Sequence, residues 1–388
     1  MFRSQARRAS VPERVVGSEV RAVGRSDRKI SVVICVYTEE RWDDIVAAVE
    51  SVRTQTRPAV ETILVVDHND LLFSMAQTSL PDVVLTVNHE KQGLSGARNS
   101  GIAIARGDVI AFLDDDAVAA PNWLELLDDV LDDPRVLGVG GHVEPNWVGP
   151  RPNWFPEEFL WTVGCSYRGL PMTTAFVRNP FGGCTCIRRE VFDTVGGFRS
   201  EIGRVGTKPL GCEETELAIR ARNRWPDRVF VYEPQASIRH KVPENRGRWS
   251  YFVSRCYSEG LSKARVARLV GARDGLSSER TYTMQTLPTG VLTGLGDALL
   301  RGDRGGLGRA AAIVAGLAYT TAGYIRESVA VRIAERRAAR IAPAGTQSRA
   351  TGRAPAAAPA VPSSADHAVS AGSSVRQPVS VVVNGQAG

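Results

Sequence analysis

The sequence of 388 residues lacks the loops by which many nucleotide-binding proteins hold phosphate. No Gly-x-Gly-x-x-Gly follows its first apolar run, which argues against an ordinary dinucleotide-binding domain, and no Walker loop is present. An anionic ligand, if the protein binds one, must therefore be held in another way, for which Arg98 and residues later in the chain are candidates.

The six cysteines also lack the pair-of-pairs spacing of a zinc site. Cys184-x-Cys186 is a weak metal hint, and free, partly buried thiols in a reducing compartment are the expected state. No apolar core before a small-residue cleavage site is visible near the beginning, so the sequence shows no cleavable signal peptide. We therefore expect a cytosolic protein.

The apolar stretches of the C-terminal third are too short to span a membrane. Residues 310–325 form an uncharged run of 16 residues, and a bilayer span needs about 20. A second apolar stretch, residues 287–300, precedes it. The pair predicts an interfacial or re-entrant helical hairpin, and a soluble packed hairpin is the alternative. Basic residues that would meet lipid headgroups follow, namely Arg326, Arg332, Arg336, Arg337 and Arg340.

What the sequence does contain is typical of a globular domain with basic appendages. It is 43% hydrophobic and 23% charged, and its net charge of +6 is concentrated at residues 1–29 and 332–353. Such ends fit anionic lipid or nucleic acid. We expect a disordered basic leader over residues 1–29, a globular domain over 30–264, a helical extension over 265–342 that could associate with a membrane, and a disordered tail rich in Ala, Pro and Ser over 343–388.

Strand-like and helical patterns alternate from residue 30 onward, which implies right-handed crossovers and a parallel sheet. Thr38 is expected to cap a helix with Trp42, Ile45, Val49 and Val52 at helical spacing. The expected strands cover residues 30–36, 61–66, 83–87 and 107–113, and further helices are expected over residues 97–103 and 215–223. The fold class is therefore α/β, with a mostly parallel central sheet flanked by helices and a C-terminal helical extension.

Carboxylates follow two of the expected strands. Asp67 comes after the second, and Asp114, Asp115 and Asp116 end the run that begins at Gly107. Unpaired charges are seldom buried, and the carboxyl ends of parallel strands are where such sheets bind ligands. A lone Asp triplet is more often a solvated acidic turn. Because Asp67 ends a strand at the same edge, the sequence favours a divalent-metal site shared with a phosphate ligand.

At this point the sequence resembles the family 2 glycosyltransferases, which have the GT-A fold. The resemblance runs from about residue 31 to about residue 264 and rests on several motifs in the right order. Residues 31–37 look like the first strand of the family, 65–67 like its second, 93–99 like its arginine-bearing loop, 112–116 like its metal motif, 182–192 and 195–198 like its acceptor-side segment, and 211–218 like its acidic catalytic motif.

The sequence departs from the family pattern at three places. The catalytic motif more often reads Glu-Asp, whereas here Glu213 precedes Glu214. Val36 and Thr38 replace the commoner Thr and Asn, so only backbone contacts to the base carry over at Val36. The segment around Arg246 echoes the motif of processive synthases without its Gln, and processive polymerisation is not inferred.

The resemblance implies a role for each candidate residue. Asp116, with His240, would hold a Mg²⁺ or Mn²⁺ ion, and a histidine ligand favours Mn²⁺. Asp67 would accept the ring N–H of the base, Asp114 or Asp115 would take the ribose hydroxyls, and Arg98 and Arg246 would bind phosphate. Arg98 pairing with the Asp triplet is the alternative. The remaining nucleotide contacts are expected at Val36, Tyr37 and Glu39.

Glu214 is the expected general base, with Glu213 as the second candidate, because an acceptor hydroxyl must lose its proton as it attacks. A single base opposite the leaving group implies inversion at the anomeric carbon. Alternatively, Glu213 and Glu216 are only acids near a helix N-terminus, where the dipole favours them.

The sequence thus predicts an inverting, metal-assisted glycosyltransferase. Its donor would be a nucleoside diphosphate sugar and its acceptor a hydroxyl on a polyprenyl-linked sugar, a glycan or a metabolite, with no nucleic acid as substrate. We expect it at the cytoplasmic face of the cell membrane. The rivals are a nucleotidyltransferase of similar fold and a catalytically inactive nucleotide-sugar-binding membrane scaffold.

Overall fold

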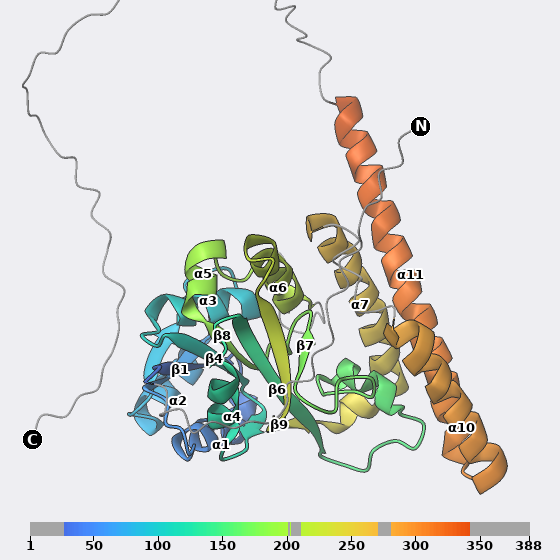
Figure 1. Cartoon of the computed structure of the whole chain (residues 1–388), viewed down its shortest axis with the longest axis horizontal. Helices are drawn as coiled ribbons and strands as arrows, with labels where there is room; N and C mark the ends of the chain where they lie inside the picture. The colour runs from blue at the N-terminus through green and yellow to red at the C-terminus, as the bar shows by residue number, and fades with distance from the viewer. Residues whose placement is uncertain (1–26, 201, 203–210, 271–280, 342–388) are drawn as a thin grey trace, which may run out of the picture.

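The computed structural model describes residues 27–200, 202, 211–270 and 281–341 (Figure 1). The predicted tail over residues 343–388 and residues 1–26 of the predicted leader lie outside this part of the chain. Arg28, also assigned to the leader, is held by the domain, because its guanidinium forms an ion pair with Asp128 at 2.8 Å.

The described residues contain a nine-stranded sheet with the order β3-β2-β1-β4-β8-β6-β9-β5, and β7 pairs with β9 beside this path. The first four strands in this order are parallel, β8 is antiparallel to both of its neighbours, and β6 is parallel to β9. The strands are β1 (Ile30–Val36), β2 (Glu61–Val66), β3 (Val84–Val87), β4 (Val109–Asp114), β5 (Ala117–Ala119), β6 (Val136–Trp147), β7 (Ala175–Val177), β8 (Cys184–Arg188) and β9 (Val229–Val242).

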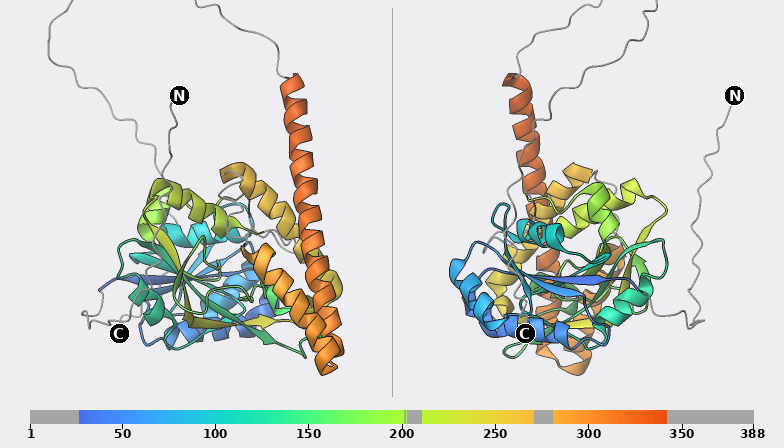
Figure 2. Two further views of the ribbon diagram at one scale, coloured as in Figure 1. Left: turned by 45° about the vertical axis from the view of Figure 1, so that its right-hand side comes forward. Right: turned by 90° about the vertical axis from the view of Figure 1, so that its left-hand side faces the viewer.

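Helices cover both faces of the sheet (Figure 2). The α-helices are α1 (Trp42–Arg53), α2 (Asp70–Ser79), α3 (Leu94–Ile104), α4 (Trp123–Val130), α5 (Arg189–Val195), α6 (Glu213–Arg224), α7 (Trp249–Val270), α10 (Leu287–Arg301) and α11 (Arg304–Ile341). Shorter helical segments are η1 (Glu39–Arg41), η2 (Glu157–Val163), η3 (Glu244–Gly247) and η4 (Tyr282–Thr286).

Two hydrophobic clusters lie on opposite faces of the sheet because successive strand residues point to opposite sides. Ile34 of β1 packs in one cluster with Ile45 of α1, and Val33 packs in the other with Ala97 of α3. All four side chains are almost fully buried. The predicted α/β class, with helices flanking the sheet and a helical region at the C-terminal end, is confirmed.

Three helix starts differ from the sequence-based expectation. Helix α3 begins at Leu94, three residues before the predicted start. Thr38 caps the short turn η1, where its hydroxyl oxygen accepts a hydrogen bond from the backbone N–H of Glu40 at 3.3 Å, and α1 begins only at Trp42. Helix α6 begins at Glu213, two residues before the predicted start. Its first turn therefore contains both candidate catalytic acids, Glu213 and Glu214.

The C-terminal helices pack on the domain as a hairpin. Helix α11 lies along α7 and α10, and small residues permit the close approach: a Cβ at Gly260 of α7 would lie 2.0 Å from the carbonyl oxygen of Thr320. Helix α7 also continues through Ala264, so the predicted domain boundary does not coincide with a helix end. None of the helices in the described residues has the length and apolar character of a membrane span.

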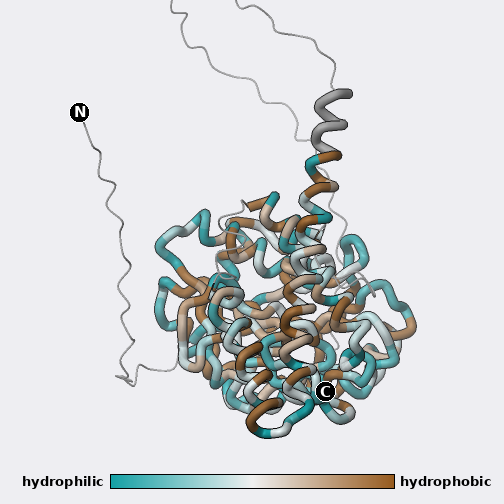
Figure 3. Tube along the Cα trace, turned by 90° about the vertical axis from the view of Figure 1, so that its right-hand side faces the viewer, coloured by the Kyte–Doolittle hydropathy of each residue, from teal (hydrophilic) through white to brown (hydrophobic). Residues whose placement is uncertain are grey.

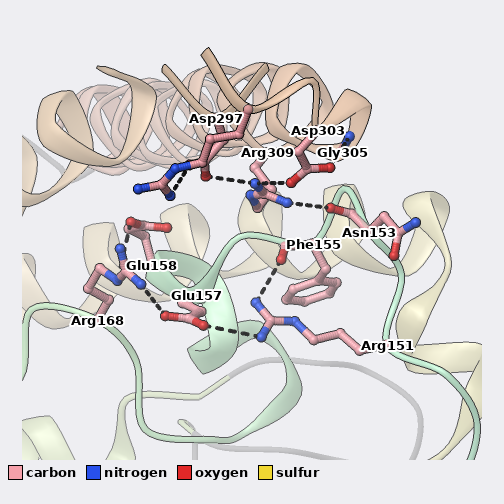
Figure 4. A network of polar contacts seen from close by, with 11 residues as sticks. Arg151, Asn153, Phe155, Glu157, Glu158, Arg168, Asp297, Asp303, Gly305 and Arg309 are labelled. Atoms are coloured by element: carbon pink, nitrogen blue, oxygen red, sulfur yellow. Dashed lines mark hydrogen bonds and ion pairs between the residues drawn. The ribbon is translucent and has the colours of Figure 1, made fainter. Parts of the chain in front are cut away.

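A polar network fixes the hairpin to the segment after β6 (Figure 4). Arg309 of α11 forms ion pairs with Asp297 at 2.9 Å and Asp303 at 2.7 Å, and its guanidinium also donates to the carbonyl oxygen of Asn153 at 3.2 Å. Nearby, the indole N–H of Trp161 donates to the hydroxyl of Tyr282 at 3.0 Å. The C-terminal helices are therefore part of the same packed unit as the sheet.

Candidate active site

The sequence-predicted residues gather in two adjoining cavities at the carboxyl ends of β1, β2 and β4. The smaller, of about 120 Å³, and the larger, of about 650 Å³, share Asp114, His240 and Arg246 in their walls. The smaller is also lined by Val36, Tyr37, Asp67, Asp115 and Asp116, and the larger by Arg98, Glu213 and Glu214. Glu39 is exposed, and its carboxylate accepts a hydrogen bond from Asn69 at 2.8 Å.

Asp114, Asp116 and His240 form a group with the spacing of a metal site. One ligand atom from each lies within 4.8 Å of the others. Strand β5 follows the Asp triplet and pairs antiparallel with β9, which sets Ala117 opposite His240. This pairing brings the carboxylate of Asp116 to 3.5 Å from His240 Nε2. Two carboxylates and an imidazole are a donor set suited to Mn²⁺, so the residues fit the expected ion.

Two arginines neutralise the carboxylates of this group. Arg41 Nη1 lies 2.7 Å from Asp115 and 3.1 Å from Asp116, and Arg246 Nη2 lies 3.5 Å from Asp116. The Arg41 guanidinium also lies over the ring of Tyr37, 5.1 Å from its centre. Sequence reasoning missed Arg41, although a single basic residue so soon after the first strand, next to Glu40, was a usable signal.

Burial shifts the pKa of two groups here. Burial, followed by the nearby charge of Asp116, raises the pKa of Asp115 to about 7, and Arg41 opposes this rise. Burial lowers the pKa of His240 despite the neighbouring carboxylates. Arg246 Nη1 lies 3.2 Å from His240 Nε2. Because a guanidinium can only donate hydrogen bonds, Nε2 must be the acceptor in this contact. The imidazole is therefore neutral, which is the form that binds metals.

Arg98 connects the donor side of the site with the acidic pair on α6. Its Nη1 donates to Glu213 at 2.9 Å, and its Nη2 lies 3.8 Å from Asp114. The guanidinium is buried beside the rings of Phe112 and Phe198, 5.7 and 5.3 Å from their centres. Arg98 is thus closer to Glu213 than to the Asp triplet. Its pairing with the triplet, which was the alternative to phosphate binding, is present only as the longer contact with Asp114.

Glu214 lines the larger cavity and differs from Glu213 in its environment. Burial, then the charge of Glu213, raises the pKa of Glu214 to about 8; Arg98 opposes this and Glu259 adds to it. Glu213 is instead fixed by Arg98, and its other carboxylate oxygen, Oε2, is buried without a hydrogen-bond partner. An acid whose pKa lies near neutrality is suited to proton transfer.

Asp67 is held in place by the loop that precedes α3. Its carboxylate accepts hydrogen bonds from the side-chain amide of Asn88 at 2.7 Å and from the backbone N–H of Gly93 at 3.0 Å. Val36 is buried at the end of β1, whereas Tyr37 is 44% exposed. Asp67, Asp116 and Glu214 therefore line one continuous region, as the sequence-based hypothesis requires.

A pair of glycines lies directly against two charged groups of the site. A Cβ at Gly183 would be 2.1 Å from Asp114 Oδ2, and a Cβ at Gly182 would be 2.8 Å from Arg98 Nη1. Only glycine leaves room for both side chains in their observed positions.

Comparisons with known proteins show which proteins this chain is similar to. The family described as "Glycosyl transferase family 2" matches residues 31–196. Over 239 residues the chain is 40% identical to the glucosyl-dolichyl phosphate glucuronosyltransferase of Haloferax volcanii, covering 61% of this chain and 76% of that protein. The succinoglycan biosynthesis protein ExoM of Rhizobium meliloti is 22% identical over 245 residues, which cover 61% of this chain and 74% of ExoM. A solved structure of mannosyltransferase PcManGT from Pyrobaculum calidifontis, in complex with GDP-Man and Mn²⁺, is 17% identical with a TM-score of 0.48, covering 76% and 87% of the two chains.

The fold and these matches define the protein as a glycosyltransferase, in the hexosyltransferase class that the sequence predicted. The chain belongs to the family 2 glycosyltransferases, with the GT-A fold. This assignment favours sugar transfer over the nucleotidyltransferase considered as a rival.

Proposed function

We propose that this protein transfers a sugar, with inversion, from a nucleoside diphosphate sugar to a hydroxyl of a lipid-linked acceptor. The observation that carries the proposal is the position of Glu214 in the wall of a cavity shared with Asp114 and His240 of the three-residue group. A donor diphosphate at that group and an acceptor hydroxyl at Glu214 would lie on two sides of one sugar.

On the donor side, the carboxylate of Asp67 accepts a hydrogen bond from the ring N–H of the base, and the backbone of Val36 contacts the base. Tyr37 is exposed enough to stack on the base. Of the two candidates for the ribose hydroxyls we choose Asp114, because its side chain is 39% exposed whereas Asp115 is buried against Arg41. In this proposal Glu39 does not contact the donor directly. It holds the side chain of Asn69, whose amide donates a hydrogen bond to its carboxylate.

Asp116 and His240 hold the divalent ion, with Asp114 beside them. When bound, the ion supplies a Lewis acid for the departing diphosphate. Arg41 and Arg246, which neutralise the carboxylates in the described structure, are then available to contact phosphate oxygens. Arg98 donates a hydrogen bond to Glu213 and so orients it, which makes Arg98 a positioning residue as well as a phosphate contact.

On the acceptor side, Glu214 removes the proton from the attacking hydroxyl. The chemistry needs an ionised carboxylate, and the raised pKa makes Glu214 a stronger base than an exposed glutamate once it is ionised. Glu213 is the weaker candidate because its carboxylate is already engaged by Arg98. Support for a lipid-linked acceptor comes from the Haloferax volcanii relative, whose name specifies a glucosyl-dolichyl phosphate.

We further propose that the protein works at the inner face of the cell membrane through its C-terminal hairpin. Leu299 and Leu300, in the last turn of α10, are 80% and 87% exposed. Apolar residues also recur along α11 (Figure 3). Exposed basic residues accompany them, namely Arg301, Arg304, Arg326 and Arg332. An apolar surface edged by arginines matches an anionic lipid interface.

Serine replacements of four exposed leucines are expected to reduce binding to anionic vesicles. The positions are Leu292, Leu299, Leu300 and Leu307. Vesicle flotation measures the bound fraction, and donor hydrolysis should stay unchanged because these side chains lie outside the cavities. The matched control is Leu71→Ser, an exposed leucine of α2. Equal flotation of the fourfold variant and the wild type would favour the soluble packed hairpin.

The proposed activity is tested with a panel of nucleotide sugars in the presence of Mn²⁺, followed by a chelator. We expect slow hydrolysis of one donor, which stops with the chelator and recovers when Mn²⁺ or Mg²⁺ is added back. Because an imidazole ligand favours the softer ion, recovery should be stronger with Mn²⁺. Hydrolysis that persists in the chelator would contradict the metal-assisted mechanism.

A further inference from the structure

The carboxylate of Asp67 has most of its hydrogen-bonding positions filled by the protein. The side-chain amide of Asn88 donates to Oδ1 at 2.7 Å, and the backbone N–H of Gly93 donates to Oδ2 at 3.0 Å. A third group of the described residues, Nδ1 of His68, lies 2.9 Å from Oδ1. Asp67 is only 8% exposed, so these protein groups, and not bulk water, decide what the carboxylate can still bind.

The side chains of Asn88 and His68 both act as donors toward Asp67. The side-chain oxygen of Asn88 accepts a hydrogen bond from the backbone N–H of Glu90 at 2.9 Å, so the NH₂ group of the same amide faces Asp67. Nδ1 of His68 faces a carboxylate oxygen, which can only accept, and this nitrogen therefore carries the proton.

These contacts leave Asp67 with one acceptor position. An ionised carboxylate has about four such positions, shared equally by its two oxygens. Oδ1 receives two donors and is full, whereas Oδ2 receives one donor and can accept one more. Asp67 lines the smaller cavity together with Tyr37 and Gly93. A ligand in that cavity can therefore give this carboxylate one hydrogen bond and no second.

The nucleic-acid bases differ in the hydrogen bonds that their edges can give to such a carboxylate. Guanine presents a ring N–H beside an amino group, and the two together pair with both oxygens of one carboxylate. Adenine and cytosine present a ring nitrogen without a proton, whose lone pair would face the carboxylate. Uracil and thymine present one ring N–H between two carbonyl oxygens. This last pattern matches a carboxylate that has one acceptor position left.

The aromatic contact expected in the same cavity does not make this distinction. Tyr37 is 44% exposed and can stack on a base. Every base has an aromatic face, so stacking tolerates any of them. The choice among the bases therefore depends on Asp67 and on the groups that fill its acceptor positions.

We propose that His68 and Asn88 set the base selectivity of the donor site by leaving Asp67 a single acceptor position. The donor is then a diphosphate of a nucleoside whose base is uracil or thymine. His68 and Asn88 are positioning residues, because they act on the base through the carboxylate of Asp67. The assignment rests on the proposed function and adds the class of donor nucleotide.

The experiment uses the full chain with saturating Mn²⁺ and measures the affinities for UDP, dTDP, CDP and GDP by titration calorimetry. These probes share a diphosphate, so differences in affinity belong to the nucleoside. We expect UDP to bind about tenfold or more tightly than CDP or GDP, because a buried site rejects a ligand that leaves a polar group unpaired. The dTDP probe has the same ring edge as UDP and should also bind more tightly than CDP. The order of UDP and dTDP then distinguishes uridine from thymidine.

The variant His68→Gly tests the selectivity mechanism by freeing one acceptor position on Oδ1 of Asp67. Glycine suits this position, because the φ angle of His68 is 54°. The ratio of UDP to GDP affinity should narrow by about threefold or more, since guanine can then use both of its donors. The ratio of UDP to CDP affinity should stay unchanged, because cytosine still lacks a ring N–H. A purely structural role of His68 would weaken all four nucleotides by one factor.

The matched control is His89→Gly, the same substitution at an exposed histidine that lines neither cavity. Its affinities for the four nucleotides should equal those of the wild type. A change in the UDP to GDP ratio as large as that of His68→Gly would contradict the role of His68.

A wild type that binds GDP or CDP as tightly as UDP would overturn the proposal whatever the variants do. An unchanged UDP to GDP ratio in His68→Gly would also overturn it. Donor hydrolysis distinguishes the two levels of inference. If a guanosine donor is hydrolysed and uridine and thymidine donors are not, the transferase stands and this base assignment is wrong. If the nucleotides bind in the expected order but no nucleotide sugar is hydrolysed, the base selectivity stands and the proposed function is wrong.

Discussion

Replacing Glu214 with glutamine is expected to lower kcat by about 10²- to 10⁴-fold, the usual contribution of a general base. Glutamine keeps the size of the side chain and cannot accept the proton. Because Glu214 lines the acceptor part of the larger cavity, the KM for the donor should change little. Steady-state kinetics with a saturating acceptor measures both constants. A Glu214→Gln variant with wild-type turnover would show that Glu214 is not the general base.

The pH profile provides a second measurement on the same residue. Since the pKa of Glu214 is about 8 and its ionised form is the active one, kcat/KM should rise tenfold per pH unit below 8 and level off above it. The charge of Glu213 contributes to this raised pKa. Glu213→Gln should therefore move the rise to lower pH while keeping its shape. If Glu213 were the base instead, its glutamine variant would lose the rise altogether.

The Asp116→Asn variant is expected to lose metal-dependent donor binding. Asp116 belongs to the three-residue group, and an amide oxygen is a weaker ligand for a divalent ion than a carboxylate. The two arginines keep other contacts, since Arg41 still pairs with Asp115 and Arg246 still contacts His240. The fold should therefore survive, and the loss should be specific to the ion.

Thermal unfolding with and without Mn²⁺ and donor measures this effect. A ligand at 100 times its Kd stabilises the folded state by about 2.7 kcal/mol, which corresponds to a Tm increase of several degrees for a domain of this size. The wild type should show this increase and Asp116→Asn should not. Asp70→Asn, at an exposed acid of α2, is the matched control and should behave as the wild type. A Mn²⁺ affinity of Asp116→Asn within twofold of the wild type would contradict the metal assignment.

The sequence predicted those parts of the site that follow from strand ends and from local motifs. Asp67 and Asp116 were found because polar side chains after buried strands meet at one edge of a parallel sheet. The resemblance to family 2 added His240 and Glu214, whose positions depend on β9 and α6 far along the chain. Family membership and the α/β fold are confirmed, while the roles of the individual residues remain predictions.

Contacts that depend on side-chain packing were not predictable in this way. No spacing rule links Arg41 to Asp115, which lie 74 positions apart and meet only when the turn η1 folds back over the end of β4. Similarly, Arg98 was assigned to phosphate, but its shortest contact is Glu213, 115 positions away. A sequence motif identifies the charged residue, and the tertiary fold decides which partner it reaches.

The unbroken course of α7 through Ala264 limits how the enzyme can be dissected. Cutting the gene at the predicted boundary would leave a helix ending one turn after Gly260, without its partner α11. The residues of η4, α10 and α11 that line the larger cavity would also be missing. Such a fragment would report on damage to the acceptor pocket and not on membrane attachment. Soluble versions for crystallisation or synthesis should therefore retain the chain through α11 and rely on polar replacements at its outer surface.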